Sequence, residues 1–180
     1  MKTLETARLI LRDWQDNDAS DLYDYAKSPK VGPMAGWKPH DTLEESKEIL
    51  AMFQRGKETW ALEEKNSHKV IGSIGLHHRT KETLGECIEI GYVLSESYWG
   101  QGLMPEAVKR VLSFAFLEQG IERIFVCHFP NNEQSKRVIQ KLGFTFLMKT
   151  EQSYRSFDGT YLDELVYEMT KEDFLKYDQQ

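Results

Sequence analysis

Two glycines ahead of a predicted helix are suited to binding an anion. Gly100 and Gly102 follow the apolar segment 88–94 and precede a helix that we expect from Pro105 to about Glu118. Proline suits the first helical position, and apolar residues recur after it with helical spacing. A helix start carries free N–H groups and a partial positive charge, and glycine lets a phosphate approach the backbone closely. Because loops also use glycine for other reasons, this feature alone leaves a purely structural role open.

A second predicted helix, over residues 132–142, carries polar side chains in its first turn. It follows the apolar strand 123–129 and ends before Gly143, a natural helix stop. Either Asn131 or Asn132 can cap this helix, which gives Asn132 a structural use, and a hydroxyl at Ser135 can hydrogen-bond the nearby backbone. These structural uses compete with any chemical role of the two side chains.

Glu89 is the most unusual polar residue, because it lies inside the apolar segment 87–93. A buried carboxylate accepts a proton more readily than an exposed one, which suits a general base acting directly or through water. The alternative is an ion pair with Arg79 or another cation. Weaker candidates for acid–base chemistry are Tyr154, Glu151, His77 and His78. The adjacent histidines point to opposite faces of a strand and no cysteine or aspartate cluster completes a set, so we expect no metal site.

These motifs occur in a recognisable order. A strand is followed by a Trp-Gly-x-Gly-x-x-x-Glu-Ala helix start at residues 99–107, by another strand, and by an Asn-x-x-Ser helix at 132–135 that ends in Leu-Gly-Phe at 142–144. This order resembles the GNAT superfamily of acetyl-CoA-dependent N-acetyltransferases. The opening Thr-Ala-Arg-Leu-Ile-Leu-Arg of residues 6–12 is similar to the first strand of the branch that contains the ribosomal-protein N-terminal (alanine/serine) acetyltransferases.

The resemblance implies an enzyme that binds acetyl-CoA as its acetyl donor. The strand that leads into Ser95 would splay from its neighbour at a β-bulge, so that its free N–H groups bind the pantetheine amide and polarise the thioester carbonyl. The pyrophosphate would lie on the N–H groups of residues 101–104, and Asn132 would hydrogen-bond the pantetheine. The residues assigned to acetyl-CoA are Val93, Leu94, Ser95, Gln101, Gly102, Leu103, Met104, Asn132, Ser135 and Lys136.

Two positions depart from the superfamily pattern of the phosphate loop. Trp99 stands where that pattern has Arg or Gln, and Met104 stands where it has Gly or Ala. A Trp-Gly-x-Gly opening is common in the branch that this chain resembles, and the anchor works through backbone groups. Met104 leaves less room beside the phosphates than glycine would.

For catalysis, the resemblance implies that Ser135 protonates the departing thiolate, in place of the Tyr of many other members, and we add Glu89 as the general base. Direct attack by the amine in a ternary complex needs no covalent nucleophile. An α-amino group, with a pKa of about 7.7–8.0, is partly neutral at pH 7, whereas a lysine at about 10.4 is not. We therefore expect a protein N-terminal α-amino group as acceptor.

Two other functions remain open from the sequence. One is acetylation of a small amine, such as a polyamine, an amino acid or an antibiotic. The other is a non-catalytic acyl-CoA-binding module. A nucleotide-binding P-loop lacks support, because Gly-Lys-Ser/Thr is missing after the glycine turn.

Composition limits the partners. The chain has 180 residues, 40% hydrophobic content and a net charge of −6, which suits one domain over residues 1–180 and disfavours nucleic acid. Coenzyme A must then be attracted locally, by cations that otherwise belong to solvated helix faces: Lys109, Arg110, Lys136, Arg137 and Lys141. With Cys87 and Cys127 expected as reduced core thiols and no apolar run near the ~20 residues of a membrane span, we expect a cytoplasmic monomer or homodimer.

The remaining pattern predicts the fold. Apolar alternation indicates seven strands at about 6–12, 59–63, 69–77, 85–94, 123–129, 144–154 and 161–170. Helices are expected to about Ala26, from Thr42 through a capping box with Glu45, over the two segments described above, and briefly over 171–176. The Pro- and Gly-rich loop 28–40 either plugs a core edge or borders the acceptor site. We therefore predict an α+β fold, a GNAT-like mixed and mostly antiparallel sheet of about seven strands flanked by about four helices.

Overall fold

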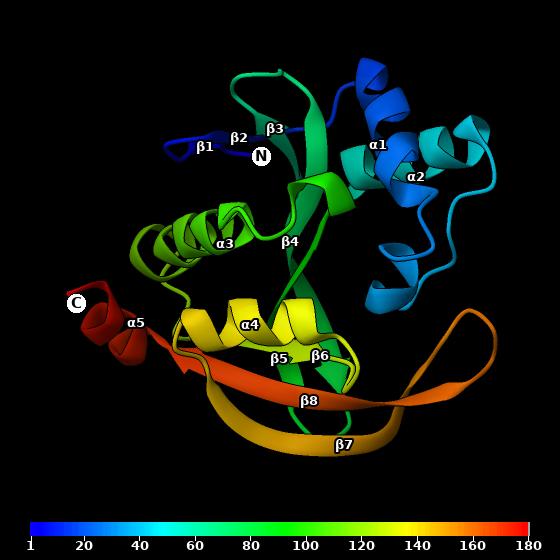
Figure 1. Ribbon diagram of the computed structural model, residues 1–180. Coiled ribbons are helices and arrows are strands. Elements are labelled where there is room, and N and C mark those ends of the chain that lie inside the picture. The colour runs from blue at the N-terminus through cyan, green and yellow to red at the C-terminus, as the bar shows by residue number, and fades with distance from the viewer. Residues whose placement is uncertain (180) are drawn as a thin grey trace. The chain divides into compact units, whose positions relative to one another are not determined.

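The computed structural model describes residues 1–179, and its β-strands form one open, mostly antiparallel sheet. The strands are β1 Leu4–Glu5, β2 Leu9–Arg12, β3 Thr59–Glu64, β4 Val70–Lys81, β5 Gly85–Leu94, β6 Arg123–His128, β7 Thr145–Arg155 and β8 Tyr161–Thr170. Their order in the eight-stranded sheet is β1-β2-β3-β4-β5-β6-β8-β7 (Figure 1). The recorded pairings are antiparallel except that of β5 with β6, which is parallel.

Five α-helices accompany the sheet. They are α1 Ala19–Ala26, α2 Leu43–Gly56, α3 Leu103–Ser113, α4 Glu133–Lys141 and α5 Lys171–Asp178. The predicted α+β class is therefore confirmed. The sheet has one strand more than predicted, because Leu4 is buried and the short β1 pairs with Leu11 and Ile10.

The prediction for α3 was wrong at its start. The helix begins at Leu103, so that Pro105 is its third residue rather than its first. Proline is compatible with this position, because the N–H groups of the first turn have no intrahelical partner. After Ser113 the chain continues as one turn of π-helix, Phe114–Glu118, and Gly120 follows with φ 69°. The predicted end near Glu118 is thus confirmed.

The chain divides into two compact units, which we treat separately. Unit 1 comprises Met1–Gly75 and Tyr92–Ala107, and unit 2 comprises Leu76–Gly91 with the residues from Val108 onward. The strands β4 and β5 contribute residues to both units. Gln180, the last residue of the predicted domain, lies outside the described residues.

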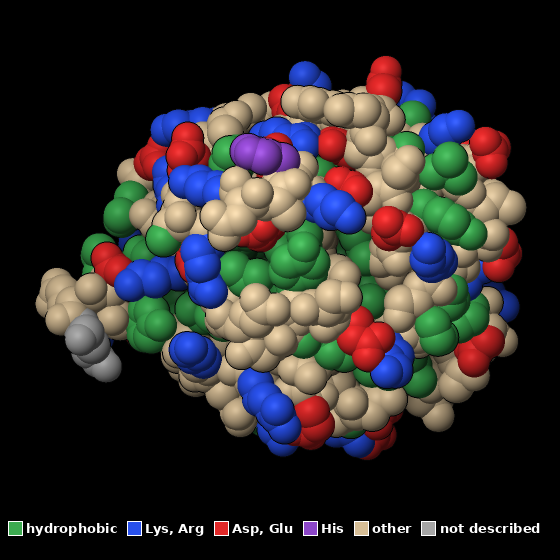
Figure 2. Space-filling model, turned by 45° about the horizontal axis from the view of Figure 1, so that its top comes forward, with side chains coloured by type: hydrophobic (Ala, Val, Ile, Leu, Met, Phe, Trp, Pro, Cys, Tyr) green, Lys and Arg blue, Asp and Glu red, His purple; other side chains and the backbone are tan. Residues whose placement is uncertain are grey.

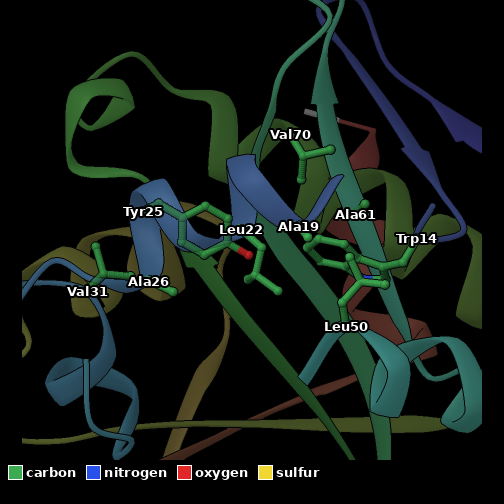
Figure 3. Close-up of a cluster of buried hydrophobic side chains, with 9 residues drawn as sticks. All are labelled: Trp14, Ala19, Leu22, Tyr25, Ala26, Val31, Leu50, Ala61 and Val70. Atoms are coloured by element: carbon green, nitrogen blue, oxygen red, sulfur yellow. The ribbon is translucent and has the colours of Figure 1, made fainter. Parts of the chain in front are cut away.

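The core of unit 1 gathers side chains from α1, α2, β3 and β4. Its buried members are Trp14, Ala19, Leu22, Tyr25, Ala26, Val31, Leu50, Ala61 and Val70 (Figure 3). Trp37 packs against this cluster, and a Cβ on Gly32 would lie 2.5 Å from the Trp37 ring. These contacts support the expected role of loop 28–40 as a plug of the core edge. The loop also contains a short 3-10 turn, Gly32–Ala35.

The start of α2 has only half of the predicted capping box. The Thr42 side chain accepts a hydrogen bond from the Glu45 N–H at 3.1 Å, as expected for an N-cap. The Glu45 carboxylate, however, accepts from the N–H of Asp41 at 2.7 Å. The reciprocal bond therefore reaches one residue further back than the capping box requires.

Unit 2 has a second apolar group, which side chains of β5, β6 and β8 form. Cys87, Phe125 and Val166 are buried together, and the rings of Phe116 and Phe174 lie 5.4 Å apart. Both cysteines are free, as predicted. In residues 1–179, no helix is long and apolar enough to cross a membrane.

Candidate functional site

The segment 95–102, which we call the β5–α3 loop, is fastened at several backbone carbonyls. The indole N–H of Trp99 donates to the Leu94 carbonyl at 2.8 Å, and the Gln101 side chain donates to the Ser97 carbonyl at 3.1 Å. The first residue of the loop is also held in place, because the Ser95 N–H donates to the carbonyl of Ile71 on β4 at 2.7 Å. Trp99, the first departure from the superfamily pattern, therefore closes the loop onto the end of β5.

The start of α3 follows two glycines in the left-handed backbone conformation. Gly100 and Gly102 have φ values of 75° and 76°, which glycine adopts without strain. The Glu106 N–H donates to the Gly102 carbonyl at 3.3 Å, and this is the bond that opens the helix. Gly102 has no side chain to cap the helix, so the N–H groups of Leu103 and Met104 have no cap from that position.

Arg8 holds this loop, and sequence reasoning missed its role. Its Nη1 donates to the Gln101 carbonyl at 2.9 Å, and its Nε donates to Glu106 Oε2 at 2.8 Å. The backbone N–H of Arg8 also donates to Glu106 Oε1 at 2.9 Å. Burial acts to raise the pKa of Glu106, but hydrogen bonds from Thr6 and Arg8 outweigh it and lower that pKa. An arginine among the alternating leucines of residues 6–12 was the available signal.

The start of α4 carries two of the predicted residues in a different arrangement. Asn132 is the N-cap, and its Oδ1 accepts the N–H of Ser135 at 3.0 Å. Ser135 is the third helical residue and is half-buried. The structural use of Asn132 is therefore confirmed, and its use toward pantetheine remains a prediction. Lys136 forms an ion pair with Glu133 at 3.5 Å.

Glu89 lies in a group of charged side chains inside unit 2. Its Oε2 is 2.5 Å from the Lys81 ammonium and 3.4 Å from the Cys127 sulfur, and Lys81 also lies 3.3 Å from Glu164. The expected ion pair with a cation is thus present, with Lys81 in place of Arg79. Burial alone would lower the pKa of Lys81, but these anionic neighbours raise it, and burial followed by Glu89 raises the pKa of the Cys127 thiol.

The weaker candidates have structural neighbours of their own. The Tyr154 ring lies 5.1 Å from Phe129, and burial, followed by the charge of Glu164, raises its pKa. Glu151 pairs with Lys149 at 3.7 Å, and His77 lies close to Gly91. In residues 1–179, no three His, Cys, Asp or Glu side chains are grouped so as to hold a metal ion.

The predicted residues are divided between the two units. Unit 1 holds Val93, Leu94, Ser95, Gln101, Gly102, Leu103 and Met104, and the contacts above join them into one strand end, loop and helix start. Unit 2 holds Glu89, Asn132, Ser135 and Lys136. Parallel pairing of β5 with β6 is recorded at Glu89 and Phe125, and the splay beyond it stays a prediction.

The cations expected to attract coenzyme A are largely engaged. Lys109 pairs with Asp178 at 2.8 Å and Arg110 with Glu118 at 3.3 Å. On the face in Figure 2, Lys and Arg side chains are interspersed with Asp and Glu side chains. These contacts favour the alternative of solvated helix faces, so that backbone N–H groups become the main candidates for holding the phosphates.

The comparison with known families identifies the class of protein. Residues 8–145 match the family described as Acetyltransferase (GNAT) domain. This match covers more than half of the chain and runs through both units, so the chain belongs to the GNAT acetyltransferases. Enzymes of this family use acetyl-CoA. The chain is therefore an N-acetyltransferase, as predicted.

Individual relatives agree with this assignment. An uncharacterised N-acetyltransferase of Bacillus subtilis, YoaA, is 30% identical over 93% of this chain and 96% of its own. The [ribosomal protein uS5]-alanine N-acetyltransferase of Escherichia coli is 25% identical over 95% of this chain and 92% of its own. A GNAT-family acetyltransferase of Bacillus anthracis has the same fold, with a TM-score of 0.84 at 21% identity over 95% of this chain and 99% of its own.

Proposed function

We propose that this enzyme transfers the acetyl group of acetyl-CoA to a protein N-terminal α-amino group, and that residues 1–180 form one catalytic domain. The observation that carries the cofactor assignment is the start of α3, where Gly102 leaves the first N–H groups without a side-chain cap. A Cβ on Gly100 would meet no other atom within 4 Å, so the backbone is open there. Such a helix start suits the pyrophosphate of coenzyme A.

Three considerations support an α-amino acceptor. Over 95% of its length the chain is similar to an enzyme named for acetylating the alanine of ribosomal protein uS5. Its net charge of −6 favours a cationic substrate. An α-amino group with a pKa of about 7.7–8.0 also supplies much of its own neutral form near pH 7, which lessens the demand on a base. Acetylation of a small amine is the alternative.

The reaction is a direct transfer. The neutral amine nitrogen attacks the thioester carbonyl, and N–H groups at the end of β5, near Val93 and Leu94, hold the oxyanion. The C–S bond then breaks, and the hydroxyl of Ser135 gives a proton to the thiolate. The nitrogen loses a proton to a base, and a proton then passes from the protonated base through water to the Ser135 alkoxide, so that the products are an amide and the free thiol of coenzyme A and both enzyme groups are restored. Binding by Val93 to Ser95, Gln101 to Met104, Asn132 and Lys136 positions the thioester.

Glu89 is the group that we propose as the base, directly or through a water molecule. Its ion pair with Lys81 gives it a competing structural use, because the ammonium already occupies Oε2. The variant Glu89→Gln separates the two. If Glu89 is the base, Glu89→Gln should flatten the pH profile of kcat/KM modestly, since the α-amine supplies much of its own neutral form, whereas loss of a structural partner alters the melting temperature without a change in that profile.

The acceptor is tested with paired peptides. One begins with a free alanine or serine and has its lysine blocked, and the other has a blocked N-terminus and a free lysine. Thiol release from acetyl-CoA should be fast with the first and slow with the second, and slow with spermidine and an aminoglycoside. Equal turnover of the two peptides, or preference for a small amine, would contradict the N-terminal acceptor while the acetyltransferase activity stands.

A further inference from the structure

We propose that Arg8 is a positioning residue for the phosphate-binding loop. By holding the Gln101 carbonyl, it turns the N–H of Gly102 toward the pyrophosphate of coenzyme A. The inference rests on the proposed function of the α3 start. It concerns a residue that lies more than ninety positions from the loop in sequence and that donates to it at 2.9 Å.

Arg8 spans the junction of loop and helix. Its Nη1 donates to the carbonyl of Gln101, the residue before the last of the loop. Its Nε and Nη2 both lie 2.8 Å from Oε2 of Glu106, in the first turn of α3. The Arg8 backbone is itself fixed, because its carbonyl accepts the N–H of Lys65 at 2.9 Å. The Arg8 side chain therefore joins the start of β2 to the loop before α3 and to the first turn of α3.

The geometry of the peptide bond turns this contact into an orientation. The chain has no cis peptide bond among its described residues, so the carbonyl of Gln101 and the N–H of Gly102 point in opposite directions within one rigid plane. Fixing the carbonyl on Arg8 fixes the N–H on the other side. Gly102 adopts φ 76°, a left-handed conformation that glycine reaches without strain, and a Cβ there would lie in ordinary van der Waals contact, 3.6 Å from Arg8 Nη2.

Position, rather than charge, is the contribution of Arg8. The carboxylate of Glu106 offsets the guanidinium charge in direct contact, which leaves little net attraction for a phosphate. A planar guanidinium can bind a carbonyl and a carboxylate at the same time through separate N–H groups. A lysine ammonium has the charge but not this fixed fork. Lysine at position 8 should therefore fail where charge alone would succeed.

The experiment compares two acetyl donors in Arg8→Lys, Arg8→Gln and Arg8→Ala. Acetyl-CoA has the pyrophosphate, and S-acetylpantetheine lacks it. We expect each variant to weaken CoA binding about tenfold, measured by calorimetry, and to raise KM for acetyl-CoA by a similar factor with little change in kcat. With S-acetylpantetheine, kcat/KM should stay within about twofold of the wild-type value.

Lys30→Ala is the matched control. Lys30 is exposed and pairs at 2.5 Å with Glu96, which lies in the β5–α3 loop. Within residues 1–179, its ammonium does not hold a loop carbonyl as Arg8 does. We expect this variant to bind CoA like the wild-type protein. Melting temperatures show whether each variant is folded, and Arg8→Lys and Arg8→Gln keep a long side chain in case Arg8→Ala does not fold.

Three results would overturn the role of Arg8. Wild-type CoA affinity in Arg8→Lys would mean that Arg8 acts through its charge alone. Equal losses with both donors would mean a general disturbance of the fold. Unchanged affinity in every Arg8 variant would remove the residue from the site. Absence of CoA binding by the wild-type protein would instead overturn the proposed function itself.

Discussion

The helices α3 and α4 begin in different ways, although both follow a strand of the same sheet. At α4 the chain caps itself, because the Asn132 side chain accepts the N–H of Ser135. At α3 the residue ahead of the helix is Gly102, which has no side chain, and the stabilising contacts come from Arg8. The self-capped start offers fewer N–H groups to a ligand, whereas the start braced at its carbonyls keeps them available.

This difference shows that the start of a helix can be used either for stability or for binding an anion. A helix start has a partial positive charge in every case. An N-cap side chain uses that charge for stability, and a glycine loop leaves it for an anion. The side chains of Arg8, Trp99 and Gln101 hold the β5–α3 loop by donating to backbone carbonyl oxygens. These three contacts do not use backbone N–H groups of the loop.

The largest expected effect separates chemistry from capping at α4. Ser135 serves the cap through its backbone N–H, so Ser135→Ala should leave that hydrogen bond in place, and the melting temperature measures any further structural use of the hydroxyl. If the hydroxyl protonates the thiolate, kcat should fall by about 10²-fold or more. Ser20→Ala, at an exposed position of α1, is the control. A full-rate Ser135→Ala enzyme would transfer the role to Tyr154 or to water.

The next effect concerns the open start of α3. Gly102→Asp places a side chain and a negative charge where the pyrophosphate is expected, so CoA affinity should fall at least tenfold, or about 1.4 kcal/mol, by calorimetry. Gly120→Asp is the matched control, because Gly120 has a φ of 69° and open space around it but lies after a helix rather than before one. Similar losses in both variants would attribute the effect to backbone strain.

A smaller effect divides the two uses of Asn132. Asn132→Ala removes the cap and should cost about 1 kcal/mol of unfolding free energy in denaturant titrations. Asn132→Asp keeps an oxygen for the Ser135 N–H and should retain that stability, but it loses the amide donor expected to bind pantetheine. Weaker CoA binding by a stable Asn132→Asp protein would support the second use. Wild-type affinity would leave Asn132 as a cap alone.

Sequence reasoning succeeded where neighbouring residues decide the structure. Residues 85–94, 123–128 and 161–170 alternate or repeat apolar side chains over whole strands, and the Asn132 cap acts within its own turn. The family resemblance predicts a phosphate loop at Gly102, and this assignment stays a prediction. The short β1 escaped because a strand of two residues has no periodicity, and only its pairing with β2 defines it.

The parts that sequence reasoning missed depend on distant contacts. Arg8 meets Gln101 and Glu106, and Lys81 meets Glu89, only after the sheet has formed. For Glu89 the expected partner was Arg79 or another cation, and the partner is Lys81, two positions after Arg79 on strand β4. Strand pairing determines which of several nearby cations contacts Glu89, and the local sequence pattern does not predict it.

The smallest effect is a difference in pH dependence between the two helix starts. The folded-state pKa of Glu106 lies below its ordinary value, so its contacts add stability above the unfolded-state pKa of about 4.3. This contribution is lost as the pH falls through the lower folded-state pKa, because the carboxylate then takes up a proton. Because the pair is partly exposed, we expect Glu106→Gln to cost at most about 1 kcal/mol at pH 7 and nothing in strong acid.

Asn132→Ala gives the comparison its reference, because an amide does not ionise. Its cost, measured by denaturant titration at the same pH values, should stay constant while the cost of Glu106→Gln disappears. A Glu106→Gln cost that persists below pH 3 would show that the carboxylate charge does not stabilise the start of α3. Such a cost would come from a contact of the neutral glutamate that glutamine does not reproduce, and not from the hydrogen bond of the Arg8 backbone to Oε1, because glutamine can also accept that bond.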